Sequence, residues 1–254
     1  MAKELARRTS FSGPALVRLL AHWNDARIRE PSQSLSDRLS QWLGWSDAIA
    51  LAGALGGAVP AGSPMTPSAS RTTRSPDYDQ EYERVRNALV DLIDNVNKPP
   101  PVRHRHRQAP AARPDNPVQT ESIEFSTYRQ RYITLQQTME ARCSELRTRL
   151  RARLAGMSPE MARLAAVDAV MEQALNEREF SVLARVPVVL EAHFRRLKHE
   201  AAPLPAAESG QESATTANAW LNVFHQDMQS VLFAELEIRL QPTQGLLAAL
   251  TRRP

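Results

Sequence analysis

The segment from Ile123 to Ala155 contains neither glycine nor proline, and its apolar residues recur at helical spacing. It ends at Gly156-Met157-Ser158-Pro159, where glycine suits the position after a helix, serine caps a new helix and proline suits its first turn. The sequence therefore predicts a long helical hairpin whose first arm is roughly 50 Å long. The apolar stripe of this first arm is formed by Tyr132, Leu135, Met139, Cys143, Leu146, Leu150, Leu154 and Met157.

The charges on the two predicted arms are opposite in sign. The first arm carries seven basic and three acidic residues, whereas Pro159–Phe180 carries two basic and five acidic residues. The arginines of the first arm flank its apolar stripe on both sides, as charges do beside the contact of two paired helices. An antiparallel fold-back places Arg142 near Glu172 or Gln173, and Arg147 near Asp168. We predict that these residues form ion pairs between the two arms of the hairpin, and that the pairs set the register of the arms more than they add stability.

Proline clusters divide the chain. Twelve of the 18 prolines lie in three segments that are also rich in Ala, Ser, Thr and Gln. Such segments bury too little apolar surface to offset the cost of ordering, so we predict flexible linkers there. The expected organisation is an N-terminal helical module over 1–59, a disordered linker over 60–77, an isolated amphipathic helix over 78–97, a basic Pro-rich linker over 98–120, and an antiparallel helical bundle over 121–254 with a flexible loop at 201–217.

Helical periodicity extends over the rest of the chain. It predicts a first helix that is capped by Ser12 and has its apolar face between Leu16 and Trp23, and a second helix that is capped by Ser34 and carries the apolar residues from Leu35 to Ile49. It also predicts a restart at Pro187 and a last helix over Ala219–Leu240. Residues 232–240 also alternate in a strand-like way, but we find no second convincing strand to pair with them. The expected fold class is all-α: a small N-terminal helical module plus an elongated antiparallel helical bundle, joined by Pro-rich flexible linkers.

The predicted helix at 78–97 carries an apolar stripe with a strict seven-residue repeat. Because it stands between two predicted linkers, we expect it to bind a partner helix or to form a dimer. The candidate partner-helix stripe consists of Tyr78, Tyr82, Val85, Leu89, Leu92 and Val96.

Motifs for catalysis are mostly absent. The sequence contains no glycine-rich phosphate loop, no G-x-S-x-G elbow, no C-x-x-C and no H-E-x-x-H. Cys143 lies on an apolar stripe and is expected to be a buried small hydrophobe rather than a nucleophile. His193 and His199 are expected to be surface or packing residues. We expect Trp42 and Trp45 to pack in a core, with contact to a partner as the alternative.

One basic run remains as a candidate contact with an acidic partner. Arg103, Arg105 and Arg107 alternate with two histidines inside the linker at 98–120. Three arginines repel a metal cation, so a metal site is disfavoured there. A solvated basic linker is the simpler interpretation, and nucleic acid or an anionic surface is the alternative ligand.

The N-terminal region carries a resemblance to a known family. Ser10–Leu20 reads SFSGPALVRLL, and Leu35–Ile49 reads LSDRLSQWLGWSDAI. These runs resemble an uncharacterised bacterial family, the domain of unknown function numbered 3348, over most of the chain. The resemblance supplies no catalytic residues. It implies association with a cell-envelope complex, because members are encoded near envelope proteins with peptidoglycan-binding domains.

These observations together favour a non-enzymatic helical interaction or assembly protein, part of an envelope-associated complex. The alternative is a nucleic-acid or anionic-surface binding protein that uses Arg103–Arg107 and the arginines of the first hairpin arm. We expect no cofactor, no metal and no transmembrane segment. With a single cysteine and no signal-peptide pattern, we expect a soluble, cytoplasmic protein.

Overall fold

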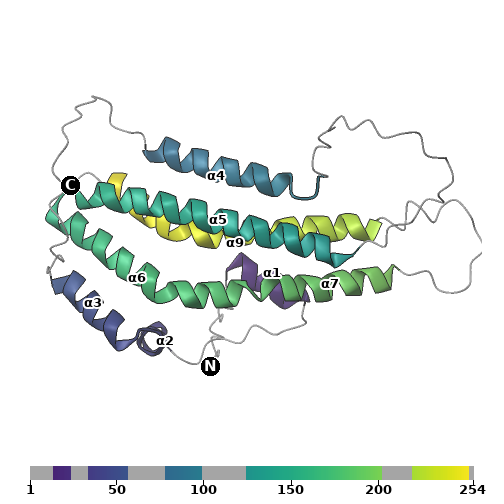
Figure 1. Cartoon of the computed structure of the whole chain (residues 1–254), viewed down its shortest axis with the longest axis horizontal. Coiled ribbons are helices and arrows are strands. Elements are labelled where there is room, and N and C mark those ends of the chain that lie inside the picture. Colours follow the sequence, from purple (N-terminus) through teal and green to yellow (C-terminus); the bar gives the residue numbers. More distant parts are fainter. Residues whose placement is uncertain (1–13, 24–33, 57–77, 99–123, 202–218, 252–254) are drawn as a thin grey trace, which may run out of the picture.

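The computed structural model describes residues 14–23, 34–56, 78–98, 124–201 and 219–251. The described residues form helices and no strands, which confirms the predicted all-α class. Figure 1 shows the longer helices lying lengthwise beside one another. The helices are α1 (Ala15–Trp23), α2 (Leu35–Trp42), α3 (Trp45–Gly56), α4 (Tyr78–Asp94), α5 (Phe125–Ala155), α6 (Pro159–Leu183), α7 (Val186–Glu200) and α9 (Ala219–Thr251).

The core forms around α5 and α9, which pack side by side and run parallel. Near the start of both helices, the rings of Phe125 and Phe224 meet edge to face at 6.2 Å between centroids. Further along, the Tyr132 hydroxyl donates to a carboxylate oxygen of Glu235. Helix α4 covers one side of this pair, and α6 with α7 covers another (Figure 1). These neighbours run in the opposite direction to α5, so the bundle combines parallel and antiparallel contacts.

The α5–α6 hairpin turns where the sequence predicted. Ser158 caps α6 by accepting a hydrogen bond from the Met161 backbone N–H at 3.2 Å, and Pro159 occupies the first turn. Gly156 ends α5 with φ −88°, so the turn does not use the left-handed conformation that favours glycine. The predicted stripe of α5 is buried from Tyr132 to Leu154, whereas Met157 in the turn is exposed.

Residues 232–240 belong to α9, which settles the choice between helix and strand in favour of helix. The helix extends beyond the predicted end at Leu240 and continues through Pro242 to Thr251. A proline inside a helix costs roughly 3 kcal/mol. Burial of Leu246 and packing of Leu247 and Leu250 on the core favour continuation of the helix in spite of that cost.

The predicted second helix is divided in two. Ser34 caps α2 by accepting from the Asp37 backbone N–H at 3.1 Å, and α2 ends before Leu43 and Gly44. Helix α3 then packs on α6, whereas α1 packs on α7 and α9. The predicted linkers at 60–77, 98–120 and 201–217 fall almost entirely outside the described residues.

The helix at 78–97 is not isolated. As α4 it packs along α5 and α9, and Tyr82, Leu89 and Ile93 are buried in the common core. Leu92 of the predicted stripe is exposed instead. A helix with 3.6 residues per turn drifts about 20° for every seven residues, so the buried face of a straight helix rotates from Leu92 toward Ile93.

Candidate functional site

A buried carboxylate lies at the centre of the bundle. Glu235 of α9 is fully buried and accepts hydrogen bonds from two side chains of α5. The Tyr132 hydroxyl donates at 2.7 Å, and the Gln136 amide donates to the two carboxylate oxygens at 3.1 and 3.0 Å. Arg239, one turn further along α9, donates to the same carboxylate at 2.9 and 3.1 Å. The charge of Glu235 is therefore balanced inside the protein.

This buried network joins three elements. Gln136 also donates to the backbone carbonyl of Leu183 at the end of α6, at 3.2 Å. Arg239 reaches Glu179 of α6 at 3.5 Å. Burial, and then the charge and hydrogen bond of Glu235, raise the pKa of Tyr132 well above its ordinary value. The tyrosine stays a hydrogen-bond donor, and the network fixes the register of α5, α6 and α9.

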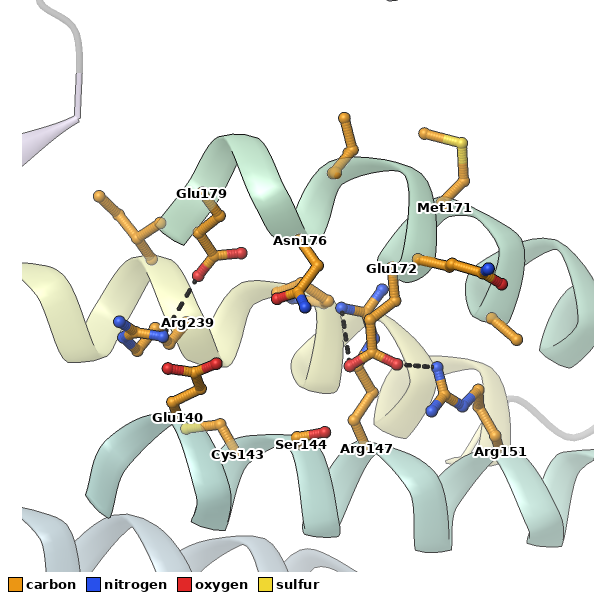
Figure 2. Close-up of a pocket in the computed structure, with 15 residues that line it drawn as sticks. Glu140, Cys143, Ser144, Arg147, Arg151, Met171, Glu172, Asn176, Glu179 and Arg239 are labelled. Atoms are coloured by element: carbon orange, nitrogen blue, oxygen red, sulfur yellow. Dashed lines mark hydrogen bonds and ion pairs between the residues drawn. The ribbon is translucent and has the colours of Figure 1, made fainter. Parts of the chain in front are cut away.

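Beside this network lies a cleft of about 440 Å³, lined by α5, α6 and α9. Figure 2 shows Cys143 and Glu140 on its α5 wall, Glu179 and Asn176 on its α6 wall, and Arg239 at one end. Burial raises the pKa of the Cys143 thiol to about 11, Arg239 lowers it in part, and Glu179 raises it further. A thiol with this pKa is protonated at neutral pH and is a poor nucleophile.

Arg147, Arg151 and Glu172 line the opposite end of the cleft, and Asp168 lies beside both arginines. Arg147 donates to Asp168 at 2.8 and 2.7 Å, in a two-pronged contact between guanidinium and carboxylate. Arg151 binds Glu172 and lies 3.4 Å from Asp168. Burial opposes the charged form of Arg147, but the hydrogen bond and charge of Asp168, with the charge of Glu172, raise its pKa above the ordinary value. Figure 2 shows Glu172 between the two arginines.

The structure thus brings Arg147 and Asp168 together at the register that the sequence predicted. Glu172 contacts Arg147 and Arg151 instead of Arg142. Arg142 is exposed and has no ion pair with any residue in the described ranges. Because α5 turns Arg142 outward, Glu172 takes its partners from the residues nearer the hairpin turn.

The arginines of α5 serve mainly internal contacts. Besides Arg147 and Arg151, Arg149 binds Glu81 of α4 and Glu145 of α5, each at 2.6 Å. These pairs do not favour contact with nucleic acid through α5. The other candidate basic residues, Arg103, Arg105 and Arg107, lie outside the described residues.

The candidate partner-helix stripe is covered by the protein itself. Tyr82 accepts a hydrogen bond from Gln244 of α9 at 2.8 Å, and Gln229 donates to the backbone carbonyl of Ile93 at 3.3 Å. A separate protein therefore has no access to the buried part of this stripe. The remaining stripe residues Tyr78, Val85 and Val96 pack partly buried against the core, and Leu89 is buried within it.

A second polar cluster, which the sequence alone did not predict, joins the end of α1 to α7 and α9. The ring of Trp23 stacks on His193 at 4.3 Å between centroids. The Nε2 of His193 lies 2.6 Å from Asp227, and Arg196 donates to its Nδ1 at 3.0 Å. Arg196 also donates to the Trp23 backbone carbonyl at 2.8 Å. Because Nδ1 accepts from Arg196, the hydrogen of a neutral ring sits on Nε2 and points to Asp227.

Apolar side chains gather at the junction between α6 and α7. Phe180 and Val188 are 64% and 63% exposed. They border a groove of about 260 Å³, which we call the junction groove. Its lining residues are Arg129, Ile133, Gln136, Gln137, Glu140, Phe180, Leu183, Ala184, Pro187, Val188 and Arg239.

Across the described residues, no group of three His, Cys, Asp or Glu side chains is placed to hold a metal ion. None of the described helices combines the length and apolar character that crossing a membrane requires. His193 stacks on Trp23 and lies within hydrogen-bond distance of Asp227, and Nε2 of His225 in α9 lies 3.1 Å from the Tyr128 hydroxyl of α5.

The fold and its buried charges define an all-α helical bundle protein with a polar centre. A family profile described as "Protein of unknown function (DUF3348)" matches residues 1–252. The chain therefore belongs to this family, which confirms the resemblance in its N-terminal runs. Neither a curated protein nor a solved structure matches the chain.

Proposed function

We propose that this protein is a non-enzymatic helical interaction component that assembles with a protein partner, in an envelope-associated complex. The observation that carries this proposal is the junction groove, where Phe180 and Val188 remain exposed beside a concave apolar surface. Exposed apolar patches next to a groove mark protein interaction sites. The envelope setting rests on the family resemblance alone.

The size of the junction groove favours a protein partner over a metabolite. Its volume of about 260 Å³ is below the ~300–1,000 Å³ typical of small-molecule pockets. Ile133, Leu183 and Pro187 supply apolar lining, and the exposed Arg129 also lines the groove. This combination suits one or two apolar side chains on a partner helix, with a polar or acidic flank beside Arg129.

The larger cleft is a poorer candidate for a binding site than the junction groove. Its volume of about 440 Å³ falls in the small-molecule range, but most of its charged groups are engaged with one another. A ligand there must compete with Asp168 and Glu172 for Arg147 and Arg151. The cleft is therefore better suited to fixing helix register than to binding a substrate.

The experiment compares tagged full-length variants in the native cell after brief cross-linking, with mass spectrometry of the recovered proteins and fractionation of the cell envelope. Phe180→Glu combined with Val188→Glu should reduce recovery of the main partner at least about tenfold, because two charges enter an apolar contact. Val223→Glu places a charge at a 45% exposed valine of α9 that does not line the groove; it is the control and should leave recovery unchanged.

Circular dichroism of each purified variant checks that the fold is retained. Equal recovery of the same partner by the doubly charged variant and the control would rule out the junction groove as the contact. Recovery of the protein away from the envelope, with its partner still bound, would rule out the envelope setting while keeping the interaction.

A further inference from the structure

Helix α3 lies at the edge of the molecule, beside α6, and only one of its faces is packed (Figure 1). Asp47 and Leu51 are half-buried and Ala54 is buried, and the three recur at helical spacing on the α6 side. The opposite face is apolar and open: Trp45 is 84% exposed and Ile49 is 57% exposed. Two small residues one and two turns further along, Ala52 and Gly56, continue this outer stripe.

Within the part of the chain that the structure describes, nothing packs on this outer stripe. Asp47 is the single charged residue in α3, and its carboxylate accepts a hydrogen bond from the Gly44 backbone N–H at 3.1 Å, as a helix cap. At Gly53 and Gly56, no described atom lies within 4 Å of the position of an added Cβ, and neither φ is left-handed. Glycine is a poor helix former, and neither packing nor backbone conformation within the protomer requires it here.

The outer stripe is complementary to a second copy of itself that runs in the opposite direction. Its residues read large, large, small, small, at helical spacings of four, three and four. In an antiparallel pair of two such helices, Trp45 faces Gly56 of the other copy and Ile49 faces Ala52. Large side chains opposite small ones let two helices approach closely and fill the space between them. A two-fold axis generates both halves of this contact from one surface.

We propose that α3 pairs antiparallel with the α3 of a second copy of this chain, through Trp45, Ile49, Ala52 and Gly56. The uncharged outer face brings no like charges together across the two-fold axis. A lipid surface is the poorer occupant, because helices that lie on membranes carry Lys or Arg beside their apolar face and α3 carries neither. A helix of 12 residues buries less surface than a permanent dimer needs, so the dimer is weak and depends on concentration.

Analytical ultracentrifugation of the full-length protein over a wide concentration range tests the pairing. The wild type should shift from monomer to dimer as concentration rises. Trp45→Glu should raise the dissociation constant at least about 30-fold, because tryptophan side chains supply much of the binding energy of small interfaces. Val223→Glu on α9 adds the same charge at another exposed apolar position and should dimerise like the wild type. Trp45 is so exposed that its replacement leaves the monomer folded.

Cysteine cross-linking tests the direction of the pair. In a Cys143→Ser background, chains carrying Trp45→Cys mixed with chains carrying Gly56→Cys should form covalent dimers. Either variant alone should not, because antiparallel pairing separates identical positions by eleven residues, or roughly 16 Å. Disulfides within the Trp45→Cys sample alone would overturn the antiparallel register. A monomer at every concentration, or vesicle binding that Trp45→Glu abolishes while the chain stays monomeric, would overturn the proposal.

Discussion

Replacement of Arg239 by methionine isolates the energetic role of the buried network. The Arg239 side chain is 8% exposed and supplies two hydrogen bonds to the fully buried Glu235. Methionine keeps most of the side-chain volume but leaves the Glu235 charge without its cation. Removing one partner of a buried ion pair costs about 3–5 kcal/mol. For a chain of this size that corresponds to a fall in Tm of roughly 6–20 °C.

A double variant separates charge from packing. In Glu235→Gln with Arg239→Met, the amide oxygen still accepts from Tyr132, but no unpaired charge is buried. We expect the double variant to be about 2 kcal/mol more stable than Arg239→Met alone. Arg195→Met is the control, because Arg195 is 76% exposed and pairs with Glu191 on the surface. It should cost less than about 1 kcal/mol.

The measurement is urea unfolding followed by far-ultraviolet circular dichroism and by tryptophan fluorescence. Coincident transitions are needed for a single free energy of unfolding. If Arg239→Met unfolds within about 1 kcal/mol of the wild type, or if the two substitutions in the double variant are additive, the inferred role of the network in stability is refuted.

Two further predictions follow from the cleft. Because burial raises the pKa of Cys143 from 9.0 to about 11, its reaction with a disulfide reagent at pH 8 should be at least about 100-fold slower in the native protein than in urea, and equal rates in both states would contradict its burial. The same shift makes the protonated thiol favour folding below pH 9, and this contribution to stability is lost as the pH rises toward 11. The double substitution Asp168→Lys with Glu172→Lys should lower the free energy of unfolding by about 1–3 kcal/mol at low salt and by less at high salt, since both carboxylates pair with Arg147 and Arg151. Glu177→Lys on the exposed side of α6 is the control, and melting curves of the double variant that match the wild type at all salt concentrations would argue against the pairing.

Local signals predicted much of the fold. The Ser34 and Ser158 caps, the turn after Ala155 and the buried stripe of α5 all follow from contacts within a few residues along the chain. The Arg147–Asp168 pair also follows from the sequence, because the hairpin turn fixes which residues of α5 and α6 face each other. Trp45 was expected in a core and is exposed, since α3 packs on α6 with its other face.

The buried network was missed for a different reason. Glu235 comes three residues after Leu232, and Arg239 comes four residues after Glu235, so two charged residues occupy the apolar stripe of α9. An oppositely charged pair at i and i+4 on such a stripe is the signal that could have found them. On its own it looks like a surface ion pair. Only the placement of Tyr132 and Gln136 against it identifies a buried site.

The sequence by itself determined the helices, the hairpin turn and the all-α class, because helix caps, turn residues and apolar periodicity act over one or two turns of chain. The tertiary structure decided which faces are covered. In it, α5 and α9 pack parallel to each other and bury Glu235 between them. The apolar stripe of α4 packs on α5 and α9, and the outer face of α3 stays exposed. Those outcomes depend on contacts between residues far apart in the chain, where burial of a charge or of an apolar stripe is set by what the neighbouring helices offer.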